Sequence, residues 1–374
     1  MGWSNHHKVG LIHYDDNRAD SGYTFLCNAA GMKSNDSQAF LIDMNGRVCH
    51  RWYRPEGILH GYLLPNGNLL CRSRQPDQIN GLDPMPGSAE SLMEIDWESN
   101  IVWQHVNQFL HHDFQRLDNG NTLALVWEEL PKNVVEGIQG GYESRIEPRR
   151  MFGDAIQEIN HRNQVISTWS IWEKLNPSED IICPLDDRRA WTHTNSIDVN
   201  GNGDFLLSHR QINTVSILSR STGSFIWKWG SRKLSHQHDA RFLMNGLVQI
   251  FDNGPHRKGM SFSRILWVDP ETDKISWEYR ADPIDEFYSF HISGAELLPS
   301  GNIFITEGAS GRLFEITING EVVWEYINPY YTRSKNGFSN SIFKAHRYHS
   351  DYIGLANRNL SPRSEALSTR MYIS

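Results

Sequence analysis

The sequence has little cysteine, and its cysteines are not arranged as a cross-linked scaffold requires. The 374 residues include four, Cys27, Cys49, Cys71 and Cys183, which are widely spaced. None is part of a C-x-x-C pair, so we expect neither a disulfide framework nor a zinc site built on such pairs. We expect most of them to be buried and reduced.

Long hydrophobic runs are also missing. No segment approaches about 18 uninterrupted apolar residues, the length that a transmembrane helix needs. Residues Met1–His7 lack a basic region followed by an apolar stretch, so they do not read as a signal peptide. We therefore expect a cytoplasmic protein with no membrane partner.

Positive charge is not in excess. Lys and Arg number 36 against 44 Asp and Glu, which gives a formal net charge of −8. Binding a nucleic-acid backbone needs clustered Lys and Arg, so nucleic acid is not the expected partner. A small anionic substrate needs only a few local cations and remains compatible. The hydrophobic share of 39% is that of an ordinary globular protein with a core.

Helical patterns are nearly absent, and the chain instead repeats one unit about six times. A unit consists of a histidine in a short strand, a Gly-containing turn, an apolar strand, an alternating strand, another turn, and a strand ending in Trp. The histidine segments are His60–Asn68, His112–Asn121, His193–Asn202, His238–Gly246, His291–Asn302 and the weaker His346–Tyr348. The tryptophan segments are Leu41–Trp52, Met93–Trp103, Gln157–Trp169, Ser216–Trp227, Leu266–Trp277 and Phe314–Trp324.

Six units of four antiparallel strands predict an all-β, six-bladed β-propeller formed by residues 1–374 as a single domain. The Asn-Gly pairs predict type I′ hairpins, and the repeated tryptophans are expected to pack between blades. Because the first tryptophan segment precedes the first histidine segment, strands at Lys8–His13, Tyr23–Asn28 and Ala39–Ile42 should complete the blade begun near His346. The long interval between His112 and His193 predicts loop insertions at about 128–150 and 173–189.

One histidine per blade at the same position would form a converging ring in the channel. Such a ring could supply a nucleophile or an acid and base, hold a divalent metal, or bind an anion. Ordinary hydrogen bonding between blades is the structural alternative. Arg210 follows the third inner hairpin and Arg241 lies three residues after His238, and two arginines favour an anionic group over a metal.

A series of short motifs between Ala190 and Trp277 resembles the bacterial aryl sulfotransferase family and its broader relatives. The motifs are W-x-H-x-N-S at Trp191–Ser196, S-x-R at Ser208–Arg210, T-G-x-x-x-W-x-x-G at Thr222–Gly230, Q-H-D at Gln237–Asp239 and F-D-N-G at Phe251–Gly254. The resemblance implies a six-bladed propeller whose channel histidine takes a sulfuryl group from an aryl sulfate ester and passes it to a phenol, without a nucleotide sulfate donor or another cofactor.

Carried over by motif, the resemblance gives each residue a role. His238 would be the nucleophile, and His193 and Arg210 would stabilise charge on the transferring oxygens. His112 is placed by repeat position only, and it would handle the phenol proton. The expected substrate-binding or supporting positions are Asn195, Arg241, Asn253, His60, His291 and His346.

Two other functions stay open. A lyase or hydrolase acting on an anionic substrate, such as a uronate-containing sugar, could use the same channel, with or without a metal on His193, His238 and His291. A non-catalytic docking platform would have little use for histidines and an arginine in its channel. Well-known sulfotransferases of the family are also periplasmic and carry a signal peptide and a disulfide, neither of which is visible in this sequence.

Overall fold

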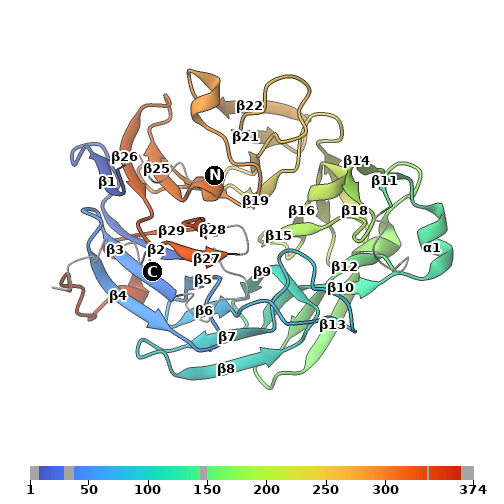
Figure 1. Cartoon of the computed structure of the whole chain (residues 1–374), viewed down its shortest axis with the longest axis horizontal. Coiled ribbons are helices and arrows are strands. Elements are labelled where there is room, and N and C mark those ends of the chain that lie inside the picture. The colour runs from blue at the N-terminus through green and yellow to red at the C-terminus, as the bar shows by residue number, and fades with distance from the viewer. Residues whose placement is uncertain (1–7, 29–37, 144–149, 335–336, 364–374) are drawn as a thin grey trace. The chain divides into compact units, whose positions relative to one another are not determined.

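The computed structural model describes residues 8–28, 38–143, 150–334 and 337–363 (Figure 1). In this part of the chain the one α-helix is α1 (Lys132–Gly137), and nearly everything else is strand, turn or loop. Six antiparallel sheets of four strands, one of them extended by a fifth, form the blades of a six-bladed β-propeller. The predicted fold class is confirmed. None of the described residues lies in a helix long and apolar enough to cross a membrane.

The chain divides into two compact units with three blades each. The first unit comprises Met1–Asp77, Glu90–Val106 and Ile292–Ser374, and the second comprises Gln78–Ala89 and Asn107–His291. A single domain spanning residues 1–374 stays a prediction.

Each blade of the first unit begins with a strand at or just after a repeat histidine, and its fourth strand carries a repeat tryptophan. The blades are β5 (His60–Leu63), β6 (Leu69–Arg72), β7 (Ser91–Ile95) and β8 (Ile101–Val106); β23 (Gly294–Leu297), β24 (Ile303–Glu307), β25 (Arg312–Ile316) and β26 (Val322–Ile327); and β29 (His346–His349), β2 (Gly22–Cys27), β3 (Gln38–Asp43) and β4 (Val48–Tyr53). A separate hairpin joins β27 (Thr332–Ser334) to β28 (Gly337–Ser339).

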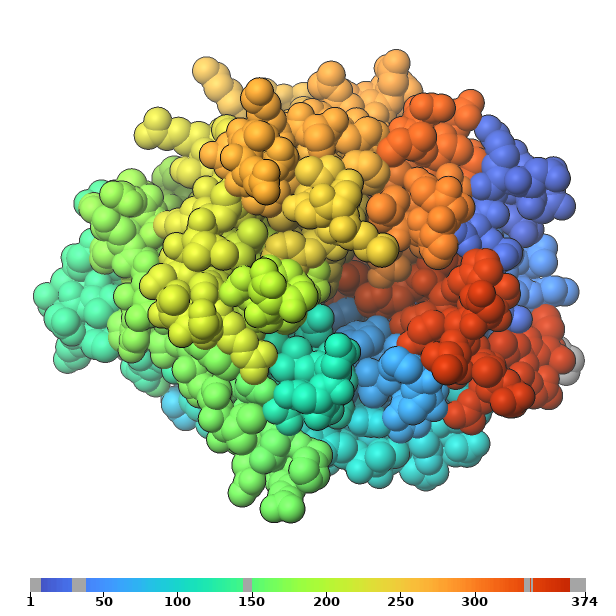
Figure 2. Space-filling model, turned by 180° about the vertical axis from the view of Figure 1, so that it is seen from behind, coloured from blue at the N-terminus to red at the C-terminus, as the bar shows by residue number. Residues whose placement is uncertain are grey.

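The blades of the second unit follow the same rule, except that β9 begins two residues before His112. The last of these blades forms the gold to orange surface in the upper part of Figure 2. The blades are β9 (Leu110–Arg116), β10 (Thr122–Glu129), β12 (Phe152–Ile159) and β13 (Val165–Ser170); β15 (Thr194–Val199), β16 (Phe205–His209), β17 (Thr214–Leu218) and β18 (Phe225–Trp229); and β19 (His238–Phe242), β20 (Val248–Asp252), β21 (Arg264–Asp269) and β22 (Lys274–Tyr279). Short 3-10 turns are η2 (Ile171–Lys174), η3 (Arg210–Ile212), η4 (Ile284–Glu286), η5 (Gly308–Ser310) and η6 (Ile353–Leu355).

The N-terminal strands join the C-terminal strand in one blade, with one exception to the prediction. β29 pairs with β2, which pairs with β3, so residues from both ends of the chain share a sheet. β1 (Gly10–Tyr14) was predicted to belong to this blade and instead pairs with β26 as a fifth strand of the preceding blade. That part of the prediction is wrong, because a strand pattern does not identify its partner.

The Asn-Gly turns also differ from the prediction. At Gly67 the amide donates to the Leu64 carbonyl oxygen over 2.8 Å, and Gly67 has a φ of +83° whereas Asn66 is not among the residues with positive φ. Type I′ turns need positive φ at both central residues, so this turn is instead a type I turn followed by a left-handed glycine. Pro65 fits its second position.

The predicted insertions form a small parallel sheet in the second unit. β11 (Gly140–Tyr142) pairs with β14 (Ile182–Asp187), and the Arg188 guanidinium donates to the Ile138 carbonyl oxygen over 2.8 Å. Of the first insertion, residues 144–149 lie outside the described residues. The described parts of the two insertions are therefore joined to each other by strand pairing and by hydrogen bonds from Arg188.

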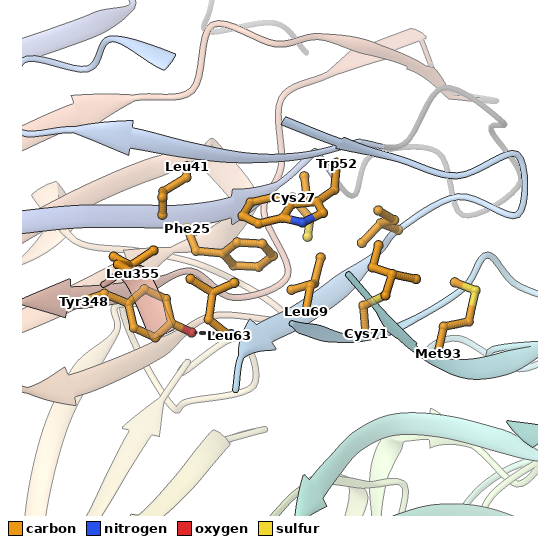
Figure 3. Packing of buried hydrophobic residues seen from close by; sticks show 13 residues of the cluster. Phe25, Cys27, Leu41, Trp52, Leu63, Leu69, Cys71, Met93, Tyr348 and Leu355 are labelled. Atoms are coloured by element: carbon orange, nitrogen blue, oxygen red, sulfur yellow. Dashed lines mark hydrogen bonds between the residues drawn. The ribbon is translucent and has the colours of Figure 1, made fainter. Parts of the chain in front are cut away.

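The core of the first unit shows how the repeated strands pack (Figure 3). Trp52 is fully buried, and its ring meets Phe25 edge to face with centroids 5.8 Å apart. The Leu63 amide donates to the Tyr348 hydroxyl over 2.7 Å, which ties β5 to β29. Of the six repeat tryptophans, Trp52 and Trp324 are fully buried and the other four are partly exposed.

Candidate active site

The four residues predicted to be catalytic lie in the second unit, on or directly next to strands of its three blades. β15 lies between β9 and β19 (Figure 1). His112 is in β9, His193 directly precedes β15, His238 begins β19, and Arg210 follows β16. His112 and His193 have φ values of +43° and +51°, and a register shift interrupts the pairing of β9, β15 and β19 near these positions. Such bulges re-aim side chains at the start of a strand.

The protonation pattern of His238 follows from its contacts. Its Nδ1 lies 2.8 Å from Asn253 Oδ1 and 3.1 Å from the His236 carbonyl oxygen. Both partners are acceptors, so Nδ1 carries the proton. The Asn253 amide is itself oriented, because its Nδ2 donates to the Ser289 carbonyl oxygen over 2.8 Å. The lone pair of a neutral His238 is therefore on Nε2.

Burial keeps this imidazole neutral. The side chain is 4% exposed, and burial, aided by the charge of Arg210, lowers the pKa of His238 to about 3. Asn253 opposes this shift, because its oxygen accepts from the protonated ring as well. At neutral pH the Nε2 lone pair is available to attack an electrophile or to bind a metal.

Arg210 supplies positive charge among the neutral imidazoles. Its guanidinium lowers the pKa values of His193, His238 and His291, in each case after the larger effect of burial. Its Nη1 lies 3.3 Å from Asp186 Oδ1. The three histidines are thus uncharged beside a guanidinium whose charge is partly balanced by Asp186, and its remaining donors suit an anionic group.

His112 and His193 lie against each other and an indole. Their ring centroids are 4.6 Å apart, and that of Trp127 lies 5.5 Å from that of His193. The His112 ring packs on Gly87, where an added Cβ would lie 2.1 Å from ring atoms. A side chain at position 87 would therefore displace His112.

Sequence reasoning missed two residues that connect to His112. His111 Nδ1 lies 3.0 Å from His112 Nδ1, and His111 Nε2 lies 3.3 Å from Asp154 Oδ1. Asp154 is fully buried, and hydroxyls of Thr192 and Thr194 donate to its Oδ2. His111 thus lies between His112 and Asp154, although its Nε2 makes no hydrogen bond with the carboxylate. The doublet His111–His112 was the visible signal, of which only the second residue entered the prediction.

Asp154 predicts a pH-dependent contribution to stability. Burial raises the pKa of its carboxyl from 3.8 to about 7. The stabilisation from protonated Asp154 is therefore fully present below the unfolded value and is lost as the pH rises through about 7. We expect the free energy of unfolding of the wild type, relative to Asp154→Asn, to fall between about pH 5 and about pH 8 in urea titrations.

The matched control for this prediction is Asp118→Asn, which changes an exposed aspartate in the turn after β9. Its difference from the wild type should not change with pH over that interval. An Asp154→Asn difference that is equal at the two pH values would show that Asp154 is ionised throughout.

The remaining predicted residues of this unit make contacts within the protein. Asn195 Nδ2 donates to the Gln237 carbonyl oxygen over 2.9 Å, so it joins two blades. The Arg241 guanidinium contacts carboxylates of Asp113 and Asp239, each at 2.7 Å, which leaves it engaged within the protein. His291 stacks on Phe290 with centroids 4.1 Å apart. Substrate contacts of these three residues stay predictions.

His60 and His346 belong to the first unit. Their ring centroids are 5.9 Å apart, and His346 Nδ1 pairs with Glu296 Oε1. They form a histidine pair in that unit, and their contact with substrate stays a prediction.

A group of potential metal ligands is present, but it is not the histidine set that a metal-dependent lyase or hydrolase was expected to use. Among the described residues, the ligand atoms of Cys183, Asp186, His236 and His256 all lie within 4.8 Å of one another. No such group is formed by His193, His238 and His291 within the part of the chain that the structure describes. No sequence motif marks the four residues, which come from three separate segments.

Comparison with known proteins identifies a family and a fold. A family model described as Arylsulfotransferase (ASST) matches residues 90–329, more than half of the chain. A solved structure of a protein of unknown function from Bacteroides caccae has a TM-score of 0.56 and 14% identity, covering 87% of this chain and 98% of that one. No curated protein matches.

Two antibiotic lyases are more distant structural neighbours. A streptogramin B lyase has a TM-score of 0.47 and 10% identity, covering 89% of this chain and 95% of that one. Virginiamycin B lyase from Staphylococcus aureus has a TM-score of 0.44 and 9% identity, covering 86% of this chain and 88% of that one.

Proposed function

The chain belongs to the arylsulfotransferase family, and we propose that it transfers a sulfuryl group from an aryl sulfate ester to a phenolic acceptor through His238. Membership of the family supports a transferase-like enzyme. The observation that carries the specific reaction is the Nδ1 contact of His238 with Asn253 Oδ1, which leaves the Nε2 lone pair free beside a cationic guanidinium.

In the first half-reaction, His238 Nε2 attacks the sulfur of the ester. A nitrogen–sulfur bond forms, the bond between sulfur and the aryl oxygen breaks, and the phenolate leaves with the electron pair. The ring becomes cationic, so its Nδ1–H donates more strongly to Asn253 Oδ1 than in the ground state. An interaction that strengthens on the way to the transition state accelerates the step.

Under this proposal, Arg210 and His193 stabilise the oxygens of the transferring group. Arg210 carries a permanent charge, and its fork of donors can contact two oxygens at once. His193 is neutral, since burial and Arg210 hold its pKa well below its usual range, and the one ring N–H of a neutral imidazole can donate to an oxygen. Donors fixed in advance at the developing charge usually contribute more to catalysis of this kind than any other single effect.

His112 handles the proton. When the phenolate leaves, it takes a proton from His112. In the second half-reaction the acceptor phenol attacks sulfur and gives its proton to His112, while the bond between sulfur and His238 Nε2 breaks and its electron pair returns to the ring, which becomes neutral again. The substrates are small anionic and phenolic molecules, and the mechanism uses no cofactor.

Intact mass spectrometry tests the proposal. The protein incubated with 4-nitrophenyl sulfate alone should release 4-nitrophenolate and gain the mass of one sulfuryl group, and added phenol should remove that mass. A protein that releases no nitrophenolate and gains no mass with a panel of aryl sulfates contradicts the proposal. A lyase or hydrolase that uses the same histidines on an anionic substrate stays a prediction. Such an enzyme would retain no sulfuryl group in this experiment.

Replacing Asn253 tests the orientation of His238. In Asn253→Ala the Nδ1 proton loses its side-chain acceptor, so the ring can populate the wrong tautomer and rotate. We expect kcat to fall about 10- to 100-fold, the usual cost of losing an orienting partner, with little change in KM. Nitrogen chemical shifts of the His238 ring should show mixed tautomers.

Asn253→Asp is the matched control, because it keeps an oxygen acceptor at the same place. It should retain the Nδ1–H tautomer and lose less activity than Asn253→Ala. If Asn253→Ala keeps both kcat and the single tautomer, Asn253 only holds its loop.

The cytoplasmic location expected from the sequence also stays a prediction.

A further inference from the structure

Four potential metal ligands converge beside the candidate active site within the second unit. Cys183 and Asp186 lie on β14, His236 precedes β19, and His256 follows β20. Cys183 Sγ lies 3.3 Å from His256 Nδ1, and Asp186 Oδ2 lies 2.7 Å from His236 Nε2. Bonds to zinc of about 2.0–2.3 Å place the ligand atoms of a tetrahedral shell about 3.3 Å or more apart. The Cys183–His256 distance has this size, and Asp186 and His236 would separate slightly around an ion.

Three buried polar atoms of this group, on His236 and Asp186, make no hydrogen bond. The His236 side chain is fully buried, and neither of its ring nitrogens makes a hydrogen bond. Asp186 Oδ2 also makes none, although it lies next to His236 Nε2, because the two atoms are close without the alignment that a hydrogen bond needs. A buried nitrogen and a buried carboxylate oxygen left in this state cost stability. A cation bound between them would satisfy both.

We propose that Cys183, Asp186, His236 and His256 bind one divalent transition-metal ion and that the donor set favours zinc. A thiolate, two imidazoles and a carboxylate are donors typical of zinc, whereas magnesium and calcium prefer oxygen. Four protein ligands complete a tetrahedral shell and leave no open position, which is the pattern of structural sites. The thiolate and the carboxylate balance the charge of the ion.

The site has a consequence for Arg210. Asp186 Oδ1 faces the Arg210 guanidinium while Oδ2 faces His236, so the carboxylate lies between the arginine and the bound cation. The ion would hold β14 against the segment that leads into β19, which begins with His238. Its role is to fix the predicted insertion and, through Asp186, the position of Arg210. The proposal does not depend on which reaction the channel carries out.

Metal analysis and cobalt spectroscopy of the full chain test the proposal. The protein is stripped with a chelator, dialysed against a stoichiometric amount of zinc or cobalt(II), and desalted. We expect one zinc per chain by elemental analysis, and for cobalt the visible bands of tetrahedral coordination with a thiolate-to-cobalt charge-transfer band in the near ultraviolet. Failure to retain the metal, or cobalt bound without the thiolate band, overturns the proposal.

Variants identify the ligands. Cys183→Ser should remove the thiolate band, and His256→Ala should lower zinc retention without unfolding the chain, because His256 is the most exposed of the four. Cys49→Ser is the matched control, since Cys49 is also a free cysteine but lies in the first unit. Zinc retention and a cobalt spectrum unchanged in both Cys183→Ser and His256→Ala would assign the metal elsewhere.

Discussion

His238→Ala is expected to lose sulfuryl transfer by about ten-thousand-fold or more, because removal of a covalent nucleophile closes the two-step route entirely. The residual rate would come from Arg210 and His193, which still bind the ester and stabilise its charge. The variant should therefore bind 4-nitrophenyl sulfate with a similar affinity while gaining no mass in the absence of acceptor. Stopped-flow release of 4-nitrophenolate and intact mass measure the two effects separately.

Two controls separate chemistry from folding. His161→Ala changes an exposed histidine in the turn between β12 and β13 and should leave every rate unchanged. His238→Asn keeps an N–H near the Nδ1 position that can donate to Asn253 Oδ1 but has no nucleophilic nitrogen, so it should be as inactive as His238→Ala and more stable. If His238→Ala still gains one sulfuryl group, the nucleophile is another residue, and His193 is the next to replace.

The blades were predictable because their information is local. A short histidine strand, an apolar strand, an alternating strand and a strand ending in tryptophan, separated by turns, recur along the sequence, and each of the six repeats became a blade. β1 was misplaced since its own residues specify a strand but not the edge that it joins, and β26 accepted it. The turn type was missed for a related reason: Gly67 adopts positive φ while Asn66 does not.

The sequence could propose site residues only where they are part of a motif. His238, His193 and Arg210 were proposed in this way, and the structure brings them into one unit, at or next to the ends of its strands, while their catalytic roles stay predictions. Asp154 and His111 were missed because their burial and their contacts join residues far apart in the chain, which no local pattern records. Arg241 has the sequence of an anion-binding residue, yet carboxylates of Asp113 and Asp239 already occupy its guanidinium.

The cysteines show the same limit. The absence of a C-x-x-C partner argues against Cys183 as a ligand, but its neighbours come from three segments that only the fold brings together. Asp186 and His256 lie on either side of the motifs that carry the family resemblance, and His236 directly precedes the Q-H-D motif. Because the four residues come from an insertion and from two loops at strand ends, their spacing in the sequence matches no metal-binding motif.

Arg210→Ala is expected to lower kcat/KM for 4-nitrophenyl sulfate by about 100- to 1,000-fold, the usual effect of removing one preorganised donor at a developing charge. Arg210→Lys should fall between the wild type and Arg210→Ala, because an ammonium keeps the charge but not the planar fork of donors. Steady-state kinetics of the three proteins measure the order. Arg162→Ala, at an exposed position in a turn, is the matched control and should match the wild type.

The electrostatic role of Arg210 gives a second measurement that does not depend on turnover. Burial first and then the charge of Arg210 hold the pKa of His291 at about 4, below its ordinary 6.5. Removing the positive charge makes protonation of the imidazole less costly, so its pKa should rise in Arg210→Ala and stay low in Arg210→Lys. An NMR titration of the ring measures both. An Arg210→Ala variant that loses activity while the pKa of His291 does not move would mean that the arginine acts by holding Asp186 and β14 rather than by its field in the channel.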